Sequence, residues 1–497
     1  MDTQLTRDAL TVLQPGFAGT TAPDWLLRRL GEGLGAVGVF GRNIVSAGQL
    51  AELTARLRAE REDVLVAIDE ESGDVTRLEV RTGSSFPGNL ALGTVDDTGL
   101  TQDVAAELGR RLAGCGVTFN WAPSADVNSD PDNPVIGVRS FGDDPRLVAR
   151  HTAAYVRGMQ ASGVAACVKH FPGHGDTAVD SHHDMPRVQA DLETLREREL
   201  VPFRAAVAAG VKAVMSAHVL TPALDPELPG TLSPAVLHGL LRAPVEQGGL
   251  GFDGLIVTDG IEMKAIADGY GIERGTVLAI AAGADAICVG GGLCDEGTVL
   301  RLRDALVRAV RQGELAEERL ADAAARVRAL ARWTLEAGAA AGTAPAPEVG
   351  LTAARRALRI TATAAHEPLT GPAYVAAFTP VANIAVGDET PWGVGAELAR
   401  LLPGTETGTH GPDSADAARV LAAAGERRIV AVVRDAHRHD WMADGLAQLL
   451  AARPDTVVVE MGLNQAPPTG SLHIATHGAA RVCGIAAAEA IVGGQPF

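Results

Sequence analysis

The feature that most constrains the fold is a series of eight short, continuous apolar segments in the first two thirds of the chain. Continuous apolar runs are typical of parallel strands that are buried on both faces. Helical patterns fall between or after these segments, and eight strands with intervening helices in about 330 residues favour a closed (β/α)8 barrel over an open doubly wound sheet. We therefore predict an α/β protein that begins with a TIM-type barrel with loop insertions. The predicted strands are Thr11–Phe17, Ala36–Phe40, Val64–Asp69, Val117–Trp121, Val164–Lys169, Lys212–Ala217, Gly254–Asp259 and Asp285–Gly290, and the predicted helices include Ala47–Glu60, Thr98–Cys115, Pro145–Ser162, Asp191–Ala209 and Glu314–Ala337.

A change of composition predicts a second domain. Residues 337–350 are rich in Ala, Gly and Pro, which is typical of a linker. We therefore expect a barrel domain at residues 1–336, a linker at 337–350 and a smaller α/β sandwich domain at 351–497. The predicted strands of the sandwich are Ala373–Phe378, Arg428–Val433 and Thr456–Met461, and its predicted helices are Gly393–Leu402, Ser414–Gly425 and Met442–Ala452.

Composition and charge exclude several functional classes. Of the 497 residues, 43 are Lys or Arg and 61 are Asp or Glu, which gives a net charge of −18. Such a surface repels phosphate backbones and anionic membranes, so we expect no nucleic-acid or membrane partner. The five cysteines form no C-x-x-C pair, which argues against a disulfide framework or a cysteine-rich zinc site. The polar N-terminus and the lack of a long apolar run predict a cytoplasmic protein.

Polar side chains gather just after the predicted strands. In a barrel the carboxyl ends of the strands form one rim, so residues nearly 200 positions apart are expected to line one pocket. A general preference of charged residues for loops does not explain this recurrence at one end of successive strands. The residues and segments concerned are Asp69–Gly73, Asp126, Asn128, Arg139, Lys169–Thr177, His218 and Asp259.

The loop from Lys169 to Met185 is the most informative of these segments, because it contains four histidines and three aspartates. One interpretation is a zinc or iron site, although no pair of histidines has ligand spacing on a recognisable helix. A second is acid/base chemistry, in which Asp180 orients the His182 imidazole and raises its pKa. A third is a loop that is held only by its own hydrogen bonds.

Asp259 stands at the end of an apolar strand beside Gly260. A carboxylate at this position is suited to act as a covalent nucleophile, or to cap the helix that follows. The segment by itself leaves both roles open.

Taken together, these motifs resemble glycoside hydrolase family 3, in the two-domain form of the bacterial cytoplasmic β-N-acetylglucosaminidase (NagZ-like) branch. The resemblance rests on Lys169–Gly175 (KHFPGHG), the downstream Asp180–His182 (DSH) and the Thr258–Asp259 pair. It is supported by Gly38–Asn43, Asp69–Arg77 and Asn133–Phe141, and it covers about residues 10–335 in a consistent order.

The resemblance implies a role for each matching residue. Asp259 would be the nucleophile, and His182, paired with Asp180, would be the general acid and then the general base. It also implies that no metal ion or organic cofactor takes part. The residues that would hold the hydroxyl groups of the sugar are Asp69, Arg77, Arg139, Lys169 and His170.

Three positions depart from the family pattern. Ser72 and Asp74 stand where the family often has glycine and arginine, and Gly260 stands where it often has a second aspartate. None of these changes removes a proposed catalytic group, so they bear on the substrate rather than on the reaction. The C-terminal domain is expected to have a structural or aglycone-shaping part, because the Asp/His dyad already fills the acid/base role.

The sequence thus predicts a retaining exo-β-N-acetylglucosaminidase. It would release terminal non-reducing β-linked N-acetylglucosamine from muropeptide fragments or chito-oligosaccharides through a glycosyl-aspartate intermediate. A phosphorylase is the main alternative, because a histidine acid/base does not repel phosphate, and it would yield N-acetylglucosamine 1-phosphate. A catalytically silent sugar-binding protein and a metal-dependent hydrolase are further alternatives.

Overall fold

The computed structural model describes residues 3–177, 185–342, 344–364, 366–380, 386 and 389–494. Its residues form two compact units, and each unit is built from separated stretches of the chain. The first unit comprises residues 1–71, 101–136 and 143–346, and the second comprises residues 72–100, 137–142 and 347–497. Two stretches that the sequence prediction placed in the barrel domain, 72–100 and 137–142, therefore cluster with the C-terminal residues.

Eight parallel strands form the barrel of the first unit, each within or close to a predicted segment. They are β1 (Leu13–Pro15), β2 (Ala36–Val39), β3 (Leu65–Ile68), β4 (Phe119–Asn120), β5 (Ala165–Phe171), β6 (Ala213–Ser216), β7 (Leu255–Thr258) and β8 (Ile287–Val289). Strands β2 to β7 form one continuous ladder in chain order, and β1 pairs with β8. The ring is completed by a bridge between Val257 and Ala286 and by contacts between β1 and β2. The predicted barrel is confirmed.

Helices follow most of the strands, as the sequence pattern predicts. They are α1 (Thr3–Thr11), α2 (Asp24–Glu32), α3 (Ala47–Glu60), α5 (Thr98–Gly114), α6 (Pro145–Ala161), α7 (Leu192–Thr194), α8 (Leu200–Ala208), α9 (Lys264–Tyr270), α10 (Ile272–Ala282), α11 (Glu296–Arg311) and α12 (Glu317–Ala340). Ser46, Asp144 and Asp295 begin α3, α6 and α11 by accepting a hydrogen bond from a first-turn amide. The predicted helix Asp191–Ala209 is interrupted, because residues Leu195–Glu199 between α7 and α8 form a wider π-helical turn. A second π-helical segment, Ala235–Arg242, precedes β7.

The barrel interior is filled by apolar side chains rather than left open. Residues from β2 to β8 form one buried cluster, in which Phe119 and Trp121 supply the bulk. Val327, Leu330 and Ala331 of α12 belong to the same cluster. A Cβ atom at Gly35, just before β2, would lie 2.9 Å from Val327, so α12 packs against the amino ends of the strands.

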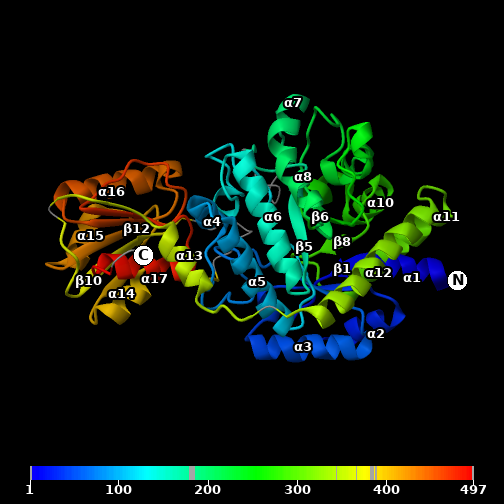
Figure 1. The fold of residues 1–497 in the computed structure, drawn as a ribbon, viewed down its shortest axis with the longest axis horizontal. Helices are drawn as coiled ribbons and strands as arrows, with labels where there is room; N and C mark the ends of the chain where they lie inside the picture. The colour runs from blue at the N-terminus through cyan, green and yellow to red at the C-terminus, as the bar shows by residue number, and fades with distance from the viewer. Residues whose placement is uncertain are drawn as a thin grey trace. The chain divides into compact units, whose positions relative to one another are not determined.

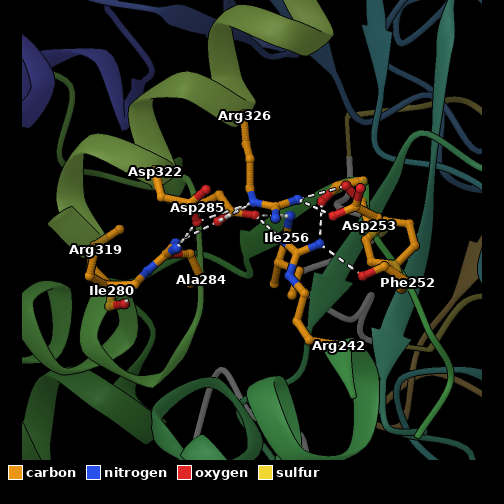
Figure 2. A network of polar contacts seen from close by, with 11 residues as sticks. Arg242, Phe252, Asp253, Ile256, Ile280, Ala284, Asp285, Arg319, Asp322 and Arg326 are labelled. Carbon is orange, nitrogen blue, oxygen red and sulfur yellow. Dashed lines mark hydrogen bonds and ion pairs between the residues drawn. The ribbon is translucent and has the colours of Figure 1, made fainter. Parts of the chain in front are cut away.

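A buried ionic network joins the amino ends of β7 and β8 (Figure 2). Asp285 is fully buried, and its carboxylate accepts hydrogen bonds from the Ile256 amide (2.9 Å), from Arg319 (2.5 Å) and from Arg242. Arg242 also donates to the Phe252 carbonyl at 3.0 Å. The carboxylate is therefore compensated on both oxygens, and the network connects two strands with the π-helical segment and with α12.

The second unit is a sheet with helices on both faces (Figure 1). The strand order is β11-β10-β12-β13-β14-β9, and all neighbours are parallel except β14 and β9. One core lies between the sheet and helices α13, α14 and α17, and the other lies between the sheet and helices α15 and α16. The elements are α4 (Asn89–Val95), α13 (Val349–Ala357), β9 (Arg359–Ala362), β10 (Ala373–Phe378), α14 (Gly395–Leu401), β11 (Glu406–His410), α15 (Ala417–Ala424), β12 (Arg428–Val433), α16 (Asp440–Ala452), β13 (Val457–Glu460), β14 (Leu472–Ala475) and α17 (Arg481–Ile491).

Asp74 explains why residues 72–100 belong to the second unit. Its buried carboxylate accepts a hydrogen bond from Arg434 at 2.5 Å, at the end of β12, and another from the Ala479 amide at 2.7 Å. The arginine that the family often has at position 74 would place a positive charge opposite Arg434 instead. The departure noted in the sequence therefore forms a structural contact within this unit.

The predicted linker is shorter in the structure than in the sequence pattern. Helix α12 runs to Ala340, because alanine favours helix, and α13 begins at Val349.

In the described part of the chain, no helix has both the length and the apolar character that crossing a membrane requires.

Candidate active site

Three charged residues meet at the carboxyl ends of β3 and β5. Lys169 is buried in β5, and its Nζ atom lies 2.5 Å from Asp69 Oδ1 and 2.6 Å from Glu71 Oε1. Asp69 keeps about a fifth of its side chain exposed (20%), whereas Glu71 is buried (3%). The buried Glu71 therefore compensates the charge of Lys169 on the side away from solvent. Asp69 is the more exposed of the two carboxylates.

His170, the next residue, is fixed by a buried aspartate on the neighbouring strand segment. Asp126 Oδ2 lies 2.6 Å from His170 Nδ1, and Asp126 Oδ1 accepts hydrogen bonds from the amides of His170 (3.2 Å) and His174 (2.7 Å). Burial by itself would raise the pKa of Asp126, but the two histidines and the amide hydrogen bond outweigh it and hold the pKa at about 2. Asp126 is thus a permanent carboxylate that fixes the orientation of the His170 ring through Nδ1.

His174 does not have the properties of a proton donor. Its ring lies 2.8 Å from the Thr177 hydroxyl, and burial lowers its pKa to about 4. The ring is therefore neutral at pH 7, and it supports the loop instead of titrating with substrate.

Asp259 follows β7 directly and is half-buried. Its Oδ1 atom accepts a hydrogen bond from the Gly260 amide at 2.8 Å. The next helix, α9, begins at Lys264 and has Met263 at its N-cap, so Asp259 does not cap that helix. The capping interpretation is wrong, because four residues separate Asp259 from the first helical turn.

Two side chains fix the chain on either side of Asp259. His218 Nε2 lies 2.9 Å from the Gly260 carbonyl oxygen. Glu262 Oε1 accepts hydrogen bonds from the amides of Gly290 (3.0 Å) and Gly291, and so joins the loops that follow β7 and β8. Burial raises the pKa of Glu262, and the charge of Asp259 adds to this rise.

The structure brings four of the sequence-predicted site residues to the barrel rim: Asp69, Lys169, His170 and Asp259. Arg77 and Arg139 lie in the second unit, where Arg139 is buried and its carbonyl accepts a hydrogen bond from Asn89 at 2.7 Å. Asp180 and His182 fall outside the described residues. In the ranges that the structure does describe, no group of three His, Cys, Asp or Glu side chains is arranged to hold a metal ion.

The sequence places Asp126, Glu71 and His218 after predicted strands, but its motifs imply no role for them. Their signal was position: each stands within six residues of the end of a predicted strand. Glu262 was not among the predicted site residues. Its only signal in the sequence was a carboxylate three positions after Asp259.

Comparisons with known proteins point to one family. A model of the glycosyl hydrolase family 3 N-terminal domain matches residues 22–330. Beta-hexosaminidase A of Pseudoalteromonas piscicida is 32% identical over 346 residues, which span 65% of this chain but only 56% of that protein. A beta-hexosaminidase of Stenotrophomonas maltophilia (strain R551-3) is 38% identical over 286 residues, which span 55% of this chain and 82% of that protein.

A solved structure resembles the chain over nearly its full length. It is a glycoside hydrolase family 3 beta-N-acetylglucosaminidase from Paenibacillus sp., with 35% identity and a TM-score of 0.87. The match covers 99% of this chain and 97% of that one, so both units have counterparts in it.

Proposed function

Because the chain belongs to glycosyl hydrolase family 3 and is a glycoside hydrolase, we propose that it is a retaining exo-β-N-acetylglucosaminidase. The observation that carries the proposal is the position of Asp259, a half-buried carboxylate directly after β7 that caps no helix. The full-length resemblance to the Paenibacillus β-N-acetylglucosaminidase supports the choice of sugar. The proposed substrates are β-linked N-acetylglucosamine at the non-reducing end of muropeptide fragments or chito-oligosaccharides.

In the first half-reaction, an Asp259 oxygen forms a bond to the anomeric carbon while the bond from that carbon to the leaving oxygen breaks. We assign to His182, oriented by Asp180, the proton that the leaving oxygen takes up. In the second half-reaction, His182 removes a proton from water, the water oxygen bonds to the anomeric carbon and Asp259 leaves. Two displacements at one carbon retain its configuration.

The remaining predicted residues are proposed to bind the sugar. Lys169 and Asp69 present one donor group and one acceptor group side by side, which suits a pair of neighbouring hydroxyls. His170, whose ring is oriented by Asp126, is proposed to bind a further hydroxyl. Arg77 and Arg139 are proposed as further residues that bind the sugar hydroxyls. The assignment of residues 1–336 as the catalytic domain and a cytoplasmic location stay predictions.

The test is turnover of an aryl β-N-acetylglucosaminide by the wild-type protein and by Asp259→Ala. The assay is run without phosphate and then with added phosphate, and Asp253→Asn, at the opposite end of β7, serves as the matched control. We expect free N-acetylglucosamine regardless of phosphate, at least a thousandfold loss in Asp259→Ala, and unchanged turnover in the control. Sugar 1-phosphate as the product would make the protein a phosphorylase, and an Asp259→Ala protein with full activity would overturn the mechanism.

A further inference from the structure

The turn that follows Asp259 contains a carboxyl group that the mechanism above does not use. The Met263 amide donates to the Gly260 carbonyl oxygen at 3.0 Å, so residues 260–263 form a tight turn, and Glu262 is its third residue. The Glu262 side chain folds back over this turn, because a Cβ atom at Gly260 would lie 3.1 Å from Glu262 Oε1 and 3.3 Å from Oε2. The carboxyl group therefore lies next to Gly260, whose amide donates to Asp259 Oδ1 at 2.8 Å.

Two links tie this turn to the segment after β8. The Ile261 amide donates to the Cys288 carbonyl oxygen at 3.0 Å. Glu262 Oε1 accepts hydrogen bonds from the amides of Gly290, at 3.0 Å, and Gly291. A Cβ atom at Gly291 would lie 2.8 Å from Oε1, so this close approach requires glycine at position 291. The turn is thus held to the neighbouring loop by a side chain as well as by the backbone.

The energetics argue against a role in packing alone. Glu262 Oε2 is buried and has no hydrogen-bond partner among the described residues. A buried carboxyl group with one unsatisfied oxygen costs stability, and an apolar side chain of similar volume would cost less. Burial accordingly raises the pKa of Glu262, and the charge of Asp259 adds to the rise. What an apolar side chain would not provide is an acceptor for the two loop amides.

Gly260 makes room for this carboxyl group. The family often has a second aspartate at this position, directly after the residue assigned as nucleophile. An aspartate there would place its Cβ atom 3.1 Å from Glu262 Oε1, and the two carboxylates would repel each other. In this chain the carboxyl group beside the nucleophile therefore comes from position 262, and it binds the loop after β8.

We propose that Glu262 is a positioning residue that holds the turn after β7 so that the Gly260 amide keeps Asp259 oriented for attack on the anomeric carbon. The inference rests on the proposed function, since it takes Asp259 as the nucleophile. It assigns to the reaction a residue outside the predicted site, and this residue acts through backbone amides instead of by contact with the sugar.

The first experiment separates the acceptor oxygen of Glu262 from its volume. Glu262→Met fills a similar volume without an acceptor, whereas Glu262→Gln keeps a carbonyl oxygen for the two loop amides. The substrate is a dinitrophenyl β-N-acetylglucosaminide, because its leaving group departs without a proton and kcat/KM then reports attack by the nucleophile. We expect kcat/KM to fall about 30-fold or more in Glu262→Met and less than about threefold in Glu262→Gln. The urea midpoint of Glu262→Met should equal or exceed that of the wild type.

The loop after β8 offers a second route to the same contact. Gly291→Ala places a methyl group 2.8 Å from Oε1 and should displace the carboxyl group, so we expect kcat/KM to fall about 10-fold or more. Gly292→Ala is the matched control, because a Cβ atom there meets nothing within 4 Å. Glu273→Met makes the same chemical change as Glu262→Met on α10, where the side chain is 40% exposed. Both controls should keep the wild-type kcat/KM.

The second experiment removes the nucleophile. In Asp259→Ala, azide from solution bonds to the anomeric carbon as the bond to dinitrophenolate breaks. The product is the α-glycosyl azide, because a single displacement inverts the configuration. With no carboxylate left to orient, adding Glu262→Met to this background should change the azide-dependent rate less than about threefold.

Each outcome decides between the possible roles. A wild-type kcat/KM in Glu262→Met, or a loss that Glu262→Gln shares in full, would overturn the proposal while the proposed function stands. An equal loss in the azide reaction would show that Glu262 shapes the pocket and does not orient Asp259. If Asp259→Ala turns over like the wild type without azide, the nucleophile is wrongly assigned, and the positioning role falls with it. If azide does not react with Asp259→Ala, the comparison of Glu262→Met with Glu262→Gln decides alone.

Discussion

The two ends of the barrel both contain buried charges, but they treat them differently. At the amino end, both oxygens of Asp285 are bound by arginines and by a backbone amide, and the arginines in turn donate to carbonyl groups (Figure 2). At the carboxyl end, Glu199 and Glu262 each have one buried oxygen without a partner among the described residues. Compensated charge holds strands together, whereas incompletely compensated charge is tolerated where it orients groups for chemistry.

The same contrast appears in the pKa values. Burial raises the pKa of Asp285, and two arginines oppose the rise. At the carboxyl end the shifts have opposite directions in neighbouring groups: the pKa of Asp126 falls to about 2, while that of Glu199 rises to about 7. Neighbouring carboxyl groups with separated pKa values are typical of an active site rather than of a structural network.

The largest effect on stability is expected for Asp285→Ala at the amino end. The substitution leaves Arg242 and Arg319 without their shared carboxylate, and breaking a buried ionic network costs about 3–5 kcal/mol. Urea unfolding should show this loss, while kcat/KM of the remaining folded protein stays within about threefold of the wild type. A stability loss below about 1 kcal/mol would contradict the structural role of this network.

Asp126→Asn at the carboxyl end is expected to reduce activity more than stability. The amide keeps the shape of the side chain but presents an NH2 group to His170 or to the two backbone amides, so His170 loses its fixed orientation. We expect kcat/KM for an aryl β-N-acetylglucosaminide to fall about 10- to 100-fold, and the loss to exceed any loss of stability expressed as free energy. Steady-state kinetics and urea unfolding on the same preparation check this, and an unchanged kcat/KM would remove Asp126 from the site.

Glu199→Gln should change how stability depends on pH. The folded-state pKa of Glu199 is raised to about 7, chiefly by burial, from its ordinary value of 4.5. The folded state therefore holds a proton that the unfolded state releases, so this group's contribution to stability is full below about pH 4.5 and is lost as the pH rises to about 7. Relative to the glutamine variant, the wild type should lose about 1–2 kcal/mol between about pH 5 and about pH 8 by urea unfolding. Parallel pH profiles of the two proteins would contradict the shift.

The smallest effect is expected for Asp253→Asn, which lies in the same amino-end network as Asp285. Its side chain is 90% exposed, and its ion pair with Arg326 at 2.9 Å is screened by water. Exposed pairs contribute about 0–1 kcal/mol, so unfolding and activity should both match the wild type closely. If Asp253→Asn lost as much free energy of unfolding as Asp285→Ala, burial would not explain which contacts of this network matter most for stability.

Sequence patterns predicted the long, continuously apolar strands of the second unit. Strands β10 (Ala373–Phe378) and β12 (Arg428–Val433) have the predicted bounds, because central parallel strands are continuous apolar runs. Strands β9, β11 and β14 were missed. β9 and β11 lie at the edges of the sheet and are largely exposed, with polar sequences. β14 (Leu472–Ala475) is buried, but it is only four residues long and contains His473, so its apolar run is too short to stand out. Edge strands lack the signal on which such prediction rests.

The site was predictable where a residue follows a strand, and not where it depends on distant segments. Asp69, Lys169 and Asp259 follow or end barrel strands, so their common rim is implied by the barrel itself. The π-helical turn Leu195–Glu199 was hidden in a helical pattern, because no sequence signal distinguishes such a turn from a regular one. The pairing of Asp74 with Arg434 joins positions 360 residues apart and could not be seen without the fold.

The second unit is built from stretches that lie far apart in the sequence, and this has a consequence for biosynthesis. Residues 72–100 contain Phe86 and Leu92, which are buried in the finished protein, and a Cβ atom at Gly350 in α13 would lie 3.1 Å from the Phe86 ring. On the ribosome, these side chains must wait for roughly 250 further residues, or about 10–50 s at ordinary elongation rates, before their partners exist. The nascent chain thus carries an unpaired apolar segment through about half of its synthesis, a period in which chaperone binding competes with aggregation.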